Sequence, residues 1–538
     1  MSRNKGAATR GTARAAYALA VSLGVSLFVG PATAEVSTGK AQGGTARVLY
    51  RGSDIDSLDP ALAYSVAAGY LIDPTCARLM RYDDGQLRPE VAVHAPRISR
   101  DGKTYTFTLR RGFRFSDGSP VRASAFAREI DRTLAPHMRS PWSAYTRDIV
   151  GAKDVLAGKK STARGVTADG PALVVRLTHP VPDFNARLAG FLCAVPANLP
   201  ADPEGVAAFP AAGPYYVAEY RPGQRVILRR NRFYVGKRTH HVDGFDVDLH
   251  ASSQEEVVDR IETGKADWGW ALPQVYFDPA RKLAAKYGVN RKQFFVQPGS
   301  TFRGYAFNTA RPLFRDNLAL RRAVSFAVDR AAFRRASGGP YSTTLTDQYL
   351  PPTMPGYRDA DIYPLSRPDL RRARALARGH TRSGKAVLYA PDLLNHLAFA
   401  QSIKKNLRQI GLEVSIKGIP LQAYFGKYMA RGDYDLGFVT WTPDYRDPSA
   451  VLNVQLDSRF IGATNWSRFH SPAYDRRLRA AARLRGAPRY RAYGRLDVRL
   501  AGEEAPMLAV DFFNDAALVS KRVGCVNRPF ELAVICLR

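Results

Sequence analysis

One stretch in the last third of the chain limits the fold more than any other. Residues 386–390 form an apolar strand pattern, and apolar side chains then recur at spacings of three and four from Leu397 to Ile410. Gly411 ends this helix pattern, and residues 412–416 alternate as a second strand. Because strands separated by one helix usually pair in parallel, the unit predicts an α/β fold. Such sheets place ligands at the carboxyl ends of their strands.

Local patterns predict three further elements. Asp101-Gly102 lies between the segments 96–100 and 103–110, which predicts a tight β-hairpin. Residues 64–80 and 318–333 are expected to form helices.

A polar loop follows the next strand pattern. Residues 436–441 predict a strand, and residues 442–448 (TPDYRDP) then form a short segment with a proline near each end. Proline fixes φ and restricts the residue before it, so the loop holds Asp444, Tyr445 and Arg446 with little residual entropy. This suits a site for a charged ligand group. Ordered surface turns share the composition, and both interpretations stay open at this point.

The first residues have the pattern of an export signal. A basic start is followed by an apolar run at 15–29 and by the small residues 32–34. We expect residues 1–34 to be a signal peptide and 35–43 a flexible leader, with an uncleaved anchor as the alternative. No cysteine lies near the expected cleavage site to carry a lipid, and no second long uncharged apolar stretch occurs downstream. We therefore expect an exported protein, extracellular or associated with the cell envelope.

The chain is strongly basic. Its formal net charge is +31, and removal of the four basic residues before residue 35 leaves 31 − 4 = +27. Such a charge attracts polyanions. The basic residues are scattered, however, and no zinc-finger or RNP pattern accompanies them, so we expect no nucleic-acid partner. An arginine-biased proteome or adhesion to an anionic envelope accounts for the charge instead.

Four cysteines lie in the exported part. Cys525 and Cys536 are close enough in sequence to close a terminal hairpin or loop, which leaves Cys76 and Cys193 as the second pair. Four cysteines allow three pairings, so the sequence does not decide the connectivity. None has CxxC spacing, which argues against a metal site.

Catalytic and metal-binding patterns are missing from the sequence. His240 and His241 precede Asp243, but adjacent histidines on a strand point to opposite faces and no third ligand is suitably spaced. The chain contains no GxSxG, no HExxH, no P-loop, and no GxGxxG between a strand and a helix. We expect a protein that is not an enzyme and needs no cofactor or metal. Catalytic groups assembled only in space would escape this reasoning.

Several segments match one family in order along the chain. The most specific is 105–121 (YTFTLRRGFRFSDGSPV), an alternating strand with a basic pair, an aromatic residue, Asp-Gly and Pro. The others are SLDP at 57–60, GPY at 213–215, YRPG at 220–223, FNT at 307–309, LRRAVSFAVDR at 320–330, and Trp-x-x-Asp-Tyr-x-Asp-Pro at 441–448. Over residues 45–538 the chain resembles the family 5 solute-binding proteins of peptide-type ABC importers, which include dipeptide- and oligopeptide-binding proteins.

The resemblance implies an α/β, two-lobed, periplasmic-binding-protein-like fold of type II, peptide-binder class, with an extra subdomain in the first lobe. Two crossings near 298–304 and 500–512 would act as the hinge, so that binding couples to closure. The implied boundaries are 44–73, 200–298 and 505–538 for the discontinuous first lobe, 74–199 for the extra subdomain, and 300–504 for the second lobe.

The resemblance also implies a ligand site. In peptide-binding relatives the aspartate at the position of Asp444 pairs with the free α-amino group of the ligand. A desolvated ammonium must be paired, and a charge-assisted hydrogen bond is a strong polar contact. Trp441 and Tyr445 would line the cleft or join a core. Arg446 would bind an anionic ligand group, or else Arg446 and Asp447 would pair with each other or face solvent.

Two further groups of residues enter the predicted site. Tyr64, Ser65 and Val66 follow the 57–60 turn, where relatives place a strand that contacts the ligand. Trp268 and Trp270 flank a glycine after a helix pattern, as cleft walls or as lobe core.

These expectations combine into one function. The chain is expected to act as a monomeric receptor that captures an oligopeptide or a similar small solute and delivers it to an ABC permease in the membrane. An exported hydrolase that uses the same cleft, and a basic protein that adheres to the envelope, are the alternatives.

Overall fold

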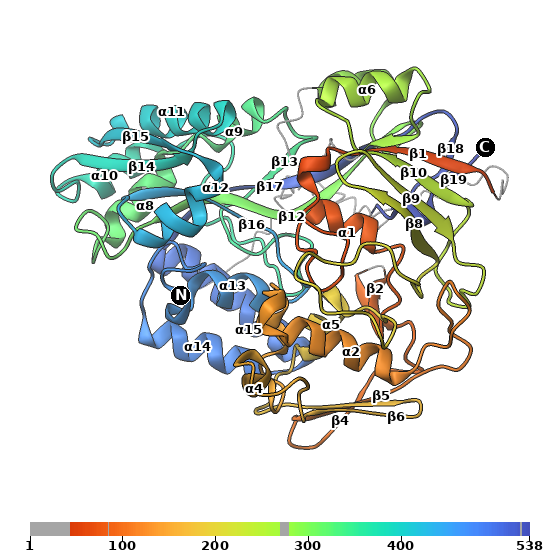
Figure 1. The fold of residues 1–538 in the computed structure, drawn as a ribbon. Helices are drawn as coiled ribbons and strands as arrows, with labels where there is room; N and C mark the ends of the chain where they lie inside the picture. The colour runs from red at the N-terminus through yellow and green to blue at the C-terminus, as the bar shows by residue number, and fades with distance from the viewer. Residues whose placement is uncertain (1–42, 84, 270–278, 528–529) are drawn as a thin grey trace, which may run out of the picture.

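The structure, a computed structural model, describes residues 43–83, 85–269, 279–527 and 530–538. Figure 1 shows three bodies: a first lobe at the upper right, a second lobe along the left side, and a subdomain below the first lobe. The expected signal peptide, nearly all of the expected leader, and Trp270 lie outside the described residues. No helix of the described ranges is both long enough and apolar enough to cross a membrane.

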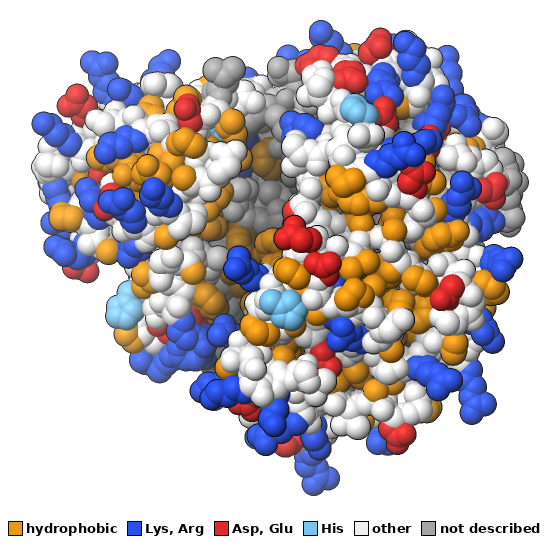
Figure 2. Space-filling view, viewed as in Figure 1, with side chains coloured by type: hydrophobic (Ala, Val, Ile, Leu, Met, Phe, Trp, Pro, Cys, Tyr) orange, Lys and Arg blue, Asp and Glu red, His pale blue; other side chains and the backbone are white. Residues whose placement is uncertain are grey.

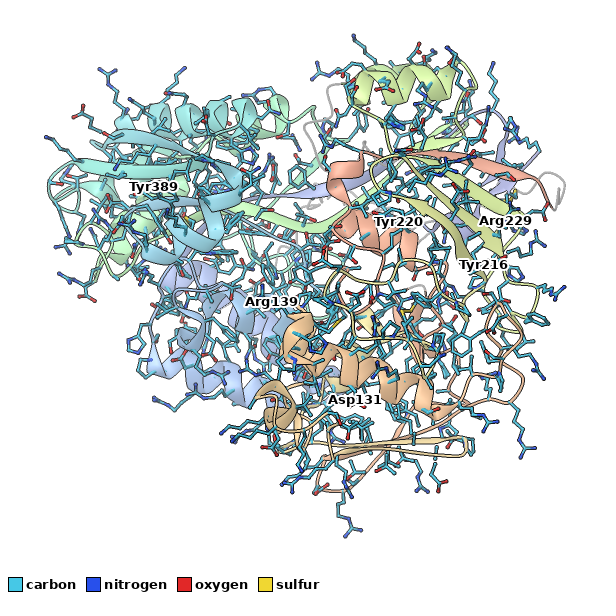
Figure 3. All side chains as sticks on the ribbon, in the orientation of Figure 1. Asp131, Arg139, Tyr216, Tyr220, Arg229 and Tyr389 are labelled. Carbon is cyan, nitrogen blue, oxygen red and sulfur yellow. A yellow bond between two sulfur atoms is a disulfide. The ribbon has the colours of Figure 1, made fainter. Side chains whose placement is uncertain are left out.

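The first lobe is built on a five-stranded sheet of order β11-β1-β10-β9-β8. In β1 the side chains of Ala46 and Val48 are buried, while Arg47 between them is partly exposed, as alternation requires. On the outer strands, Tyr216 of β8 lies opposite Arg229 of β9, and Tyr220, further along β8, lies opposite Val226 (Figure 3). The elements are β1 (Thr45–Leu49), α1 (Val66–Ile72), β8 (Tyr215–Arg221), β9 (Arg225–Arg230), β10 (Gly244–Asp248), α6 (Gln254–Glu262), β11 (Trp268–Gly269), α7 (Pro279–Tyr287), β18 (Val523–Cys525) and β19 (Cys536–Leu537).

The subdomain has its own core under a four-stranded sheet of order β4-β5-β7-β6. The predicted Asp-Gly hairpin joins β4 to β5, with Gly102 at φ +73°, and Tyr105 and Phe107 are fully buried. Helix α2 covers this sheet through Phe126 and Ile130. The elements are β2 (Met80–Asp83), β3 (Gln86–Pro89), β4 (Arg97–Ile98), β5 (Thr104–Thr108), α2 (Ala123–Leu134), α3 (Ser143–Thr146), α4 (Ala152–Leu156), β6 (Val166–Asp169), β7 (Ala172–Arg176) and α5 (Phe184–Phe191).

The second lobe contains a six-stranded sheet of order β13-β17-β12-β16-β14-β15. Strand β14 pairs in parallel with both β15 and β16, so the predicted strand–helix–strand unit is confirmed, and Ile403 and Leu407 of its helix α11 are fully buried. The elements are β12 (Phe294–Phe307), α8 (Leu318–Ala327), α9 (Arg330–Ala336), β13 (Thr343–Leu345), α10 (Leu370–Ala377), β14 (Lys385–Pro391), α11 (Leu394–Arg408), β15 (Glu413–Ile419), α12 (Leu421–Ala423), β16 (Leu436–Trp441), α13 (Ser449–Leu456), α14 (Pro472–Arg483), α15 (Gly486–Arg499) and β17 (Met507–Leu518).

Strands β12 and β17 connect the two lobes. Their outer halves pair at 294–298 with 514–518 and pack into the cores of the first lobe. Their inner halves, 302–306 and 507–512, lie in the core of the second lobe. The pairing register shifts between Pro298 and Phe302, so the ladder is irregular where the chain passes from one lobe to the other.

Two predicted helices differ from the structure. A helix over 64–80 was expected, but α1 ends at Ile72 because Pro74 cannot continue it. A helix over 318–333 was also expected. It divides into α8 and α9 because Asp329 caps the second part, accepting a hydrogen bond from the amide of Ala332.

The four cysteines form two disulfides. Cys76 is joined to Cys193, across a sequence separation of 117 residues, and Cys525 is joined to Cys536 across 11. The first closes the subdomain at its base, and the second links β18 to β19.

Candidate functional site

The loop at 442–448 connects β16 to α13 at the carboxyl end of a parallel strand, as the sequence predicted. Two hydrogen bonds fix its ends. The indole Nε1 of Trp441 donates to the carbonyl of Ala450 at 2.8 Å, and the amide of Ser449 donates to Oδ1 of Asp447 at 2.9 Å. Trp441 also packs edge-on against Trp466, so its side chain supports the loop from the second lobe.

The carboxylate of Asp444 lies where all three bodies meet. The hydroxyl of Tyr145, from α3 of the subdomain, donates to Oδ2 of Asp444, and the hydroxyl of Tyr64, from the first lobe, also donates to this carboxylate. Among the residues that the structure describes, no Lys, Arg or His lies within ion-pair distance of Asp444. The side chain is thus partly buried and bonded to neutral donors alone.

The electrostatics of this group leave a charge without a counterion. Burial raises the pKa of the Asp444 carboxyl above its usual range, and the hydroxyls of Tyr145 and Tyr64 offset part of that rise. Burial, and then the charge of Asp444, raise the pKa of both tyrosines, so they remain protonated donors. The arrangement therefore favours a cation that approaches Asp444 from the solvent-accessible side.

Aromatic rings surround the carboxylate. Trp142 stacks on Phe191 with ring centroids 5.1 Å apart, and Tyr64 meets Trp142 edge-on at 5.2 Å. Tyr145 meets Tyr445 edge-on at 5.6 Å. These contacts join the first lobe, the subdomain and the loop through aromatic packing beside the Asp444 carboxylate.

An ionic cluster lies behind the loop. Asp183, which directly precedes α5 in the subdomain, accepts hydrogen bonds from the hydroxyls of Tyr445 at 2.7 Å and Ser449 at 3.0 Å. Arg489 of α15 makes two bonds to Asp447, at 2.9 and 2.7 Å. The expected pairing of Asp447 with Arg446 is therefore wrong, because the buried Arg489 satisfies Asp447 from the far side of the loop.

Each carboxylate of the cluster has a cation in its own body, and one longer ion pair crosses between the bodies. Arg187 of the subdomain contacts Asp183 at 3.1 Å, Arg489 pairs with Asp447 inside the second lobe, and Arg489 also lies 3.7 Å from Asp183. Burial acts to raise the pKa of Asp183, but Arg187 and Arg489 outweigh it and hold that pKa at about 2. Separation of the bodies would leave neither carboxylate without a cation.

Arg446 extends from the loop toward the subdomain. Its Nη2 donates to the carbonyl of Thr353 at 2.7 Å, and its guanidinium lies against Gly85. The hydroxyl of Tyr82 donates to its backbone carbonyl at 3.5 Å. Within the described part of the chain, Arg446 has no carboxylate partner, and its guanidinium lies in the contact between second lobe and subdomain.

Ser65 and Val66 begin helix α1, as the pattern over 64–80 predicted, and do not form the strand that the resemblance implied. The hydroxyl of Ser65 caps α1 by accepting a hydrogen bond from the amide of Ala68, and the amides of Tyr64 and Ser65 both donate to Asp56 at 2.8 Å. These bonds fix the position from which Tyr64 reaches Asp444.

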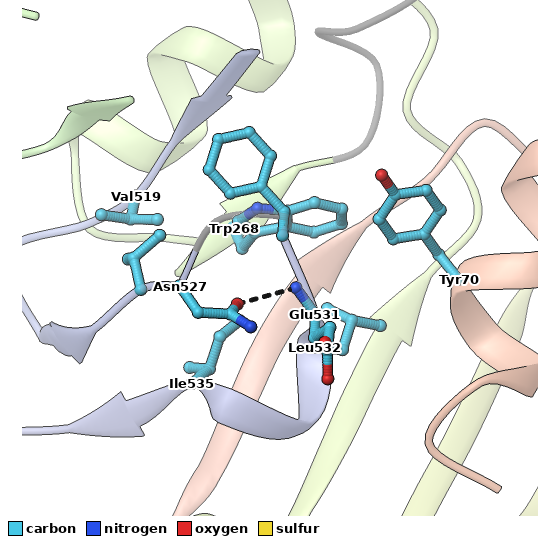
Figure 4. A pocket seen from close by; sticks show the side chains of 9 residues that line it. Tyr70, Trp268, Val519, Asn527, Glu531, Leu532 and Ile535 are labelled. Atoms are coloured by element: carbon cyan, nitrogen blue, oxygen red, sulfur yellow. Dashed lines mark hydrogen bonds between the residues drawn. The ribbon is translucent and has the colours of Figure 1, made fainter. Parts of the chain in front are cut away.

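Trp268 lies in the core of the first lobe. It is almost fully buried and lines a pocket with Tyr70, Val519 and Leu532, next to the segment where the amide of Glu531 donates to Asn527 at 3.0 Å (Figure 4). Of the two predicted roles for Trp268, cleft wall or lobe core, the structure therefore shows the core.

The histidine pair has a local role. Nδ1 of His240 lies 2.7 Å from the carbonyl oxygen of Arg238. The described ranges contain no group of three or more His, Cys, Asp or Glu side chains placed to hold a metal ion.

Sequence reasoning missed four residues at the site. Tyr145, Trp142 and Asp183 reach the loop only because the subdomain packs against the second lobe. Arg489 reaches it through the packing of α15 within the second lobe. The aromatic pair in the segment SPWSAYT at 140–146 was the one local signal, and it has no helical or strand period.

Comparisons with known proteins define the class. The family model of bacterial extracellular solute-binding proteins, family 5 (Middle), matches residues 86–462. The oligopeptide-binding protein OppA of Bacillus subtilis is 26% identical over 456 residues, which covers 78% of this chain and 79% of that protein. The probable deoxycholate-binding periplasmic protein YgiS of Escherichia coli is 26% identical over 497 residues, covering 88% and 89%.

The fold agrees. The solved structure of the clavulanic acid biosynthesis oligopeptide binding protein 2 superposes with a TM-score of 0.82 at 24% identity, covering 93% of this chain and 96% of that one. The two-lobed architecture with an extra subdomain is therefore confirmed. The protein is a solute-binding protein of the ABC-transporter type, and not an enzyme. More narrowly, the chain belongs to family 5 of the bacterial extracellular solute-binding proteins.

Proposed function

We propose that this protein is the receptor of an ABC importer, and that it binds an oligopeptide or a similar small solute through a free amino group at Asp444. The observation that carries the proposal is a partly buried carboxylate that faces the other two bodies and is bonded only to neutral hydroxyls. A solute ammonium would supply the missing charge, and a charge-assisted bond in such surroundings is among the stronger polar contacts.

The donors of Asp444 make closure part of binding. Tyr64 and Tyr145 come from bodies other than the one that carries Asp444, so the carboxylate has its full set of partners only when the lobes are together. We propose the irregular crossing of β12 and β17 near Pro298 as the hinge, with a first lobe of 44–73, 200–298 and 505–538, a subdomain of 74–199 and a second lobe of 300–504.

The aromatic rings beside Asp444 would hold the apolar part of the solute. Trp142 and Tyr64 present ring faces and edges next to the carboxylate, and these recognise shape without a fixed hydrogen-bond pattern. The backbone of an extended peptide would then be bound through main-chain groups, which do not depend on side-chain identity. Export through a signal peptide at 1–34, transfer to a membrane permease, and action as a monomer complete the proposal.

Native mass spectrometry of the protein as purified from its host tests this function. We expect a retained solute that is released on denaturation and contains a free amino group. The Asp444→Asn variant should be recovered empty, while Asp433→Asn, an exposed carboxylate on the same segment paired with Arg431, should keep the solute. A retained solute without a cationic group, or equal occupancy in Asp444→Asn, would overturn the assignment of Asp444.

A further inference from the structure

The helical hairpin formed by α14 and α15 presents arginine almost to the exclusion of other charges. Residues 471–499 contain two acidic side chains, and both are buried: Asp475 accepts from Ser458 at 3.0 and 2.6 Å, and Asp497 accepts from the amide of Tyr349 at 3.0 Å. Every exposed charge on this hairpin is therefore positive. The exposed arginines are Arg476, Arg477, Arg483, Arg485, Arg491, Arg495 and Arg499.

Most of these arginines have no ionic partner. Arg499 pairs with Glu503 at 3.6 Å, and the other six form no ion pair with any described residue. Figure 2 shows Lys and Arg side chains gathered at the lower left of the molecule, over the place of α14 in Figure 1. Within the described residues these six guanidinium groups have no carboxylate partner, although that of Arg477 stacks on Tyr474 and that of Arg485 lies against Gly102.

The spacing of the arginines gives the hairpin one basic face. Arg476 and Arg483 lie two helical turns apart on α14, and Arg491, Arg495 and Arg499 recur every four residues on α15. Both helices bury their opposite faces in the same second-lobe core, so both stripes face outward from one layer. We call this surface, 476–499, the basic face.

An apolar side chain lies at the tip of this face. Leu484 follows the last residue of α14 and is 39% exposed, with Arg483 and Arg485 on either side. An exposed leucine between two arginines suits the boundary between lipid headgroups and acyl chains, where both kinds of group are satisfied. A soluble polyanion would gain nothing from it.

The basic face is a local feature and not only a result of the overall composition. Helix α6 of the first lobe carries Glu255, Glu256 and Glu262 alongside Arg260, and Arg260 is paired with Asp248 and Glu256. Figure 2 shows acidic and basic side chains side by side at the top right, over α6. In the hairpin the same kind of surface lacks acids.

We propose that the basic face binds the surface of a membrane that contains anionic lipid. Its arginines would bind headgroup phosphates, for which the guanidinium fork is well suited, and Leu484 would enter the boundary of the acyl chains. The buried side of α15 bears Arg489, which contacts the back of the Asp444 loop, so the basic face points away from that loop. A protein held in this way keeps the candidate solute site accessible.

Sedimentation with vesicles tests the proposal on the chain without residues 1–34. We expect it to bind vesicles of phosphatidylcholine with about one-third phosphatidylglycerol, not phosphatidylcholine alone, and to release them as salt rises from about 0.05 to about 0.5 M. Replacing Arg476, Arg483 and Arg485 by Gln should lower the partition coefficient by about five-fold for each arginine, hence about a hundred-fold in total.

A matched control has the same change of charge elsewhere. Arg88→Gln, Arg371→Gln and Arg408→Gln remove three exposed arginines outside the hairpin, and should lower binding by less than about ten-fold. Leu484→Ser should weaken vesicle binding without affecting retention on heparin. Equal losses in the two triple variants, no binding of the unaltered chain to anionic vesicles, or indifference to Leu484→Ser would overturn the proposal.

Discussion

At the scale of single residues, Asp444 combines two properties that usually exclude each other. Burial raises its pKa, yet both of its hydrogen bonds come from neutral hydroxyls, so no charge in the described molecule compensates its ionised form. Because the folded pKa is raised, its contribution to stability is present at low pH and is lost as pH rises through that pKa. The ionised form of Asp444 is the form whose charge a solute ammonium can neutralise.

The variant Asp444→Asn should therefore be more stable than the unaltered protein when empty, and should bind solute more weakly. Without the buried charge, we expect the melting temperature of the solute-free protein to rise by about 1–3 °C at neutral pH, while solute affinity falls by about a hundred-fold or more because the ammonium loses its partner. Differential scanning calorimetry with and without solute measures both. A variant that loses stability and affinity together would show that Asp444 is a structural loop residue.

Glu129 gives the protein a second pH dependence. It is fully buried and shares the guanidinium of Arg132 with Asp59, through bonds from Arg132 to each carboxylate. Burial raises the pKa of Glu129 to about 8, because Arg132 compensates only in part and Asp59 adds to the rise. Its contribution is fully present below the unfolded pKa of about 4.3 and is lost as pH rises through about 8.

Glu129→Gln should remove this dependence. The amide keeps an acceptor for Arg132 and cannot ionise, so we expect the variant to gain on the order of 2–4 kcal/mol relative to the unaltered protein between pH 5 and pH 9. Urea unfolding at both pH values provides the comparison. If the free energy of unfolding changed with pH equally in the two proteins, Glu129 would not carry a proton in the folded state.

Individual site residues were predictable only where a local pattern marks them. Asp444 and Tyr64 follow recognisable motifs, whereas Tyr145 has no pattern and enters the site through the docking of α3. For Arg446 and Asp447 the sequence suggested a neighbouring pair. In the structure these two side chains do not pair, because Arg489, 42 residues from Asp447, donates two hydrogen bonds to the Asp447 carboxylate.

At the scale of elements, the contact between α5 and α13 controls how the subdomain meets the second lobe. Tyr445 and Ser449 donate across it to Asp183, while each body keeps its own ion pair. The contact can open without stranding a buried charge, so it suits a surface that forms on closure.

Tyr445→Phe should therefore affect binding more than folding. Loss of one hydroxyl bonded to a buried carboxylate costs about 1.5–3 kcal/mol, which we expect as a ten- to hundred-fold loss in solute affinity with a melting temperature of the empty protein within about 1 °C of normal. Tyr428→Phe, in the same lobe and outside this contact, is the control for hydroxyl removal. A large drop in melting temperature with unchanged affinity would mean that the bodies stay docked throughout.

The two disulfides should differ in their effect on stability. The Cys76–Cys193 bond closes a loop of 117 residues and the Cys525–Cys536 bond a loop of 11. The entropy of the unfolded chain predicts stabilisation of about 5 and about 3 kcal/mol respectively. Paired alanine variants compared by urea unfolding should show the larger loss for Cys76 and Cys193. Equal losses would indicate that native-state contacts, not loop closure, dominate.

Secondary structure was predicted best where the hydrophobic period ends at a turn residue. Gly102 turns the β4–β5 hairpin, and Gly411 follows α11 before β15. The expected helix over 318–333 has a continuous period, but the side chain of Asp329 competes as an N-cap and divides it. A local hydrogen bond of this kind is visible only once the backbone direction is known.

At the scale of the whole molecule, the order of motifs was enough to predict two lobes and a subdomain, because each motif carries its place in the family's chain order. The way in which the subdomain packs on the second lobe was not predictable. It depends on contacts such as Tyr145 with Asp444 and Tyr82 with Arg446, which join residues about 300 or more positions apart.

The central claim is that Asp444 binds the free amino group of the solute, and N-terminal acetylation tests it directly. Acetylation removes the ammonium and leaves the rest of a peptide unchanged. In calorimetric titrations with a pool of short peptides and its N-acetylated counterpart, we expect binding of the free pool and at least about a hundred-fold weaker binding of the acetylated pool, since the carboxylate would be buried without a cation. Binding of the free pool with equal affinity for the acetylated pool would contradict the assignment.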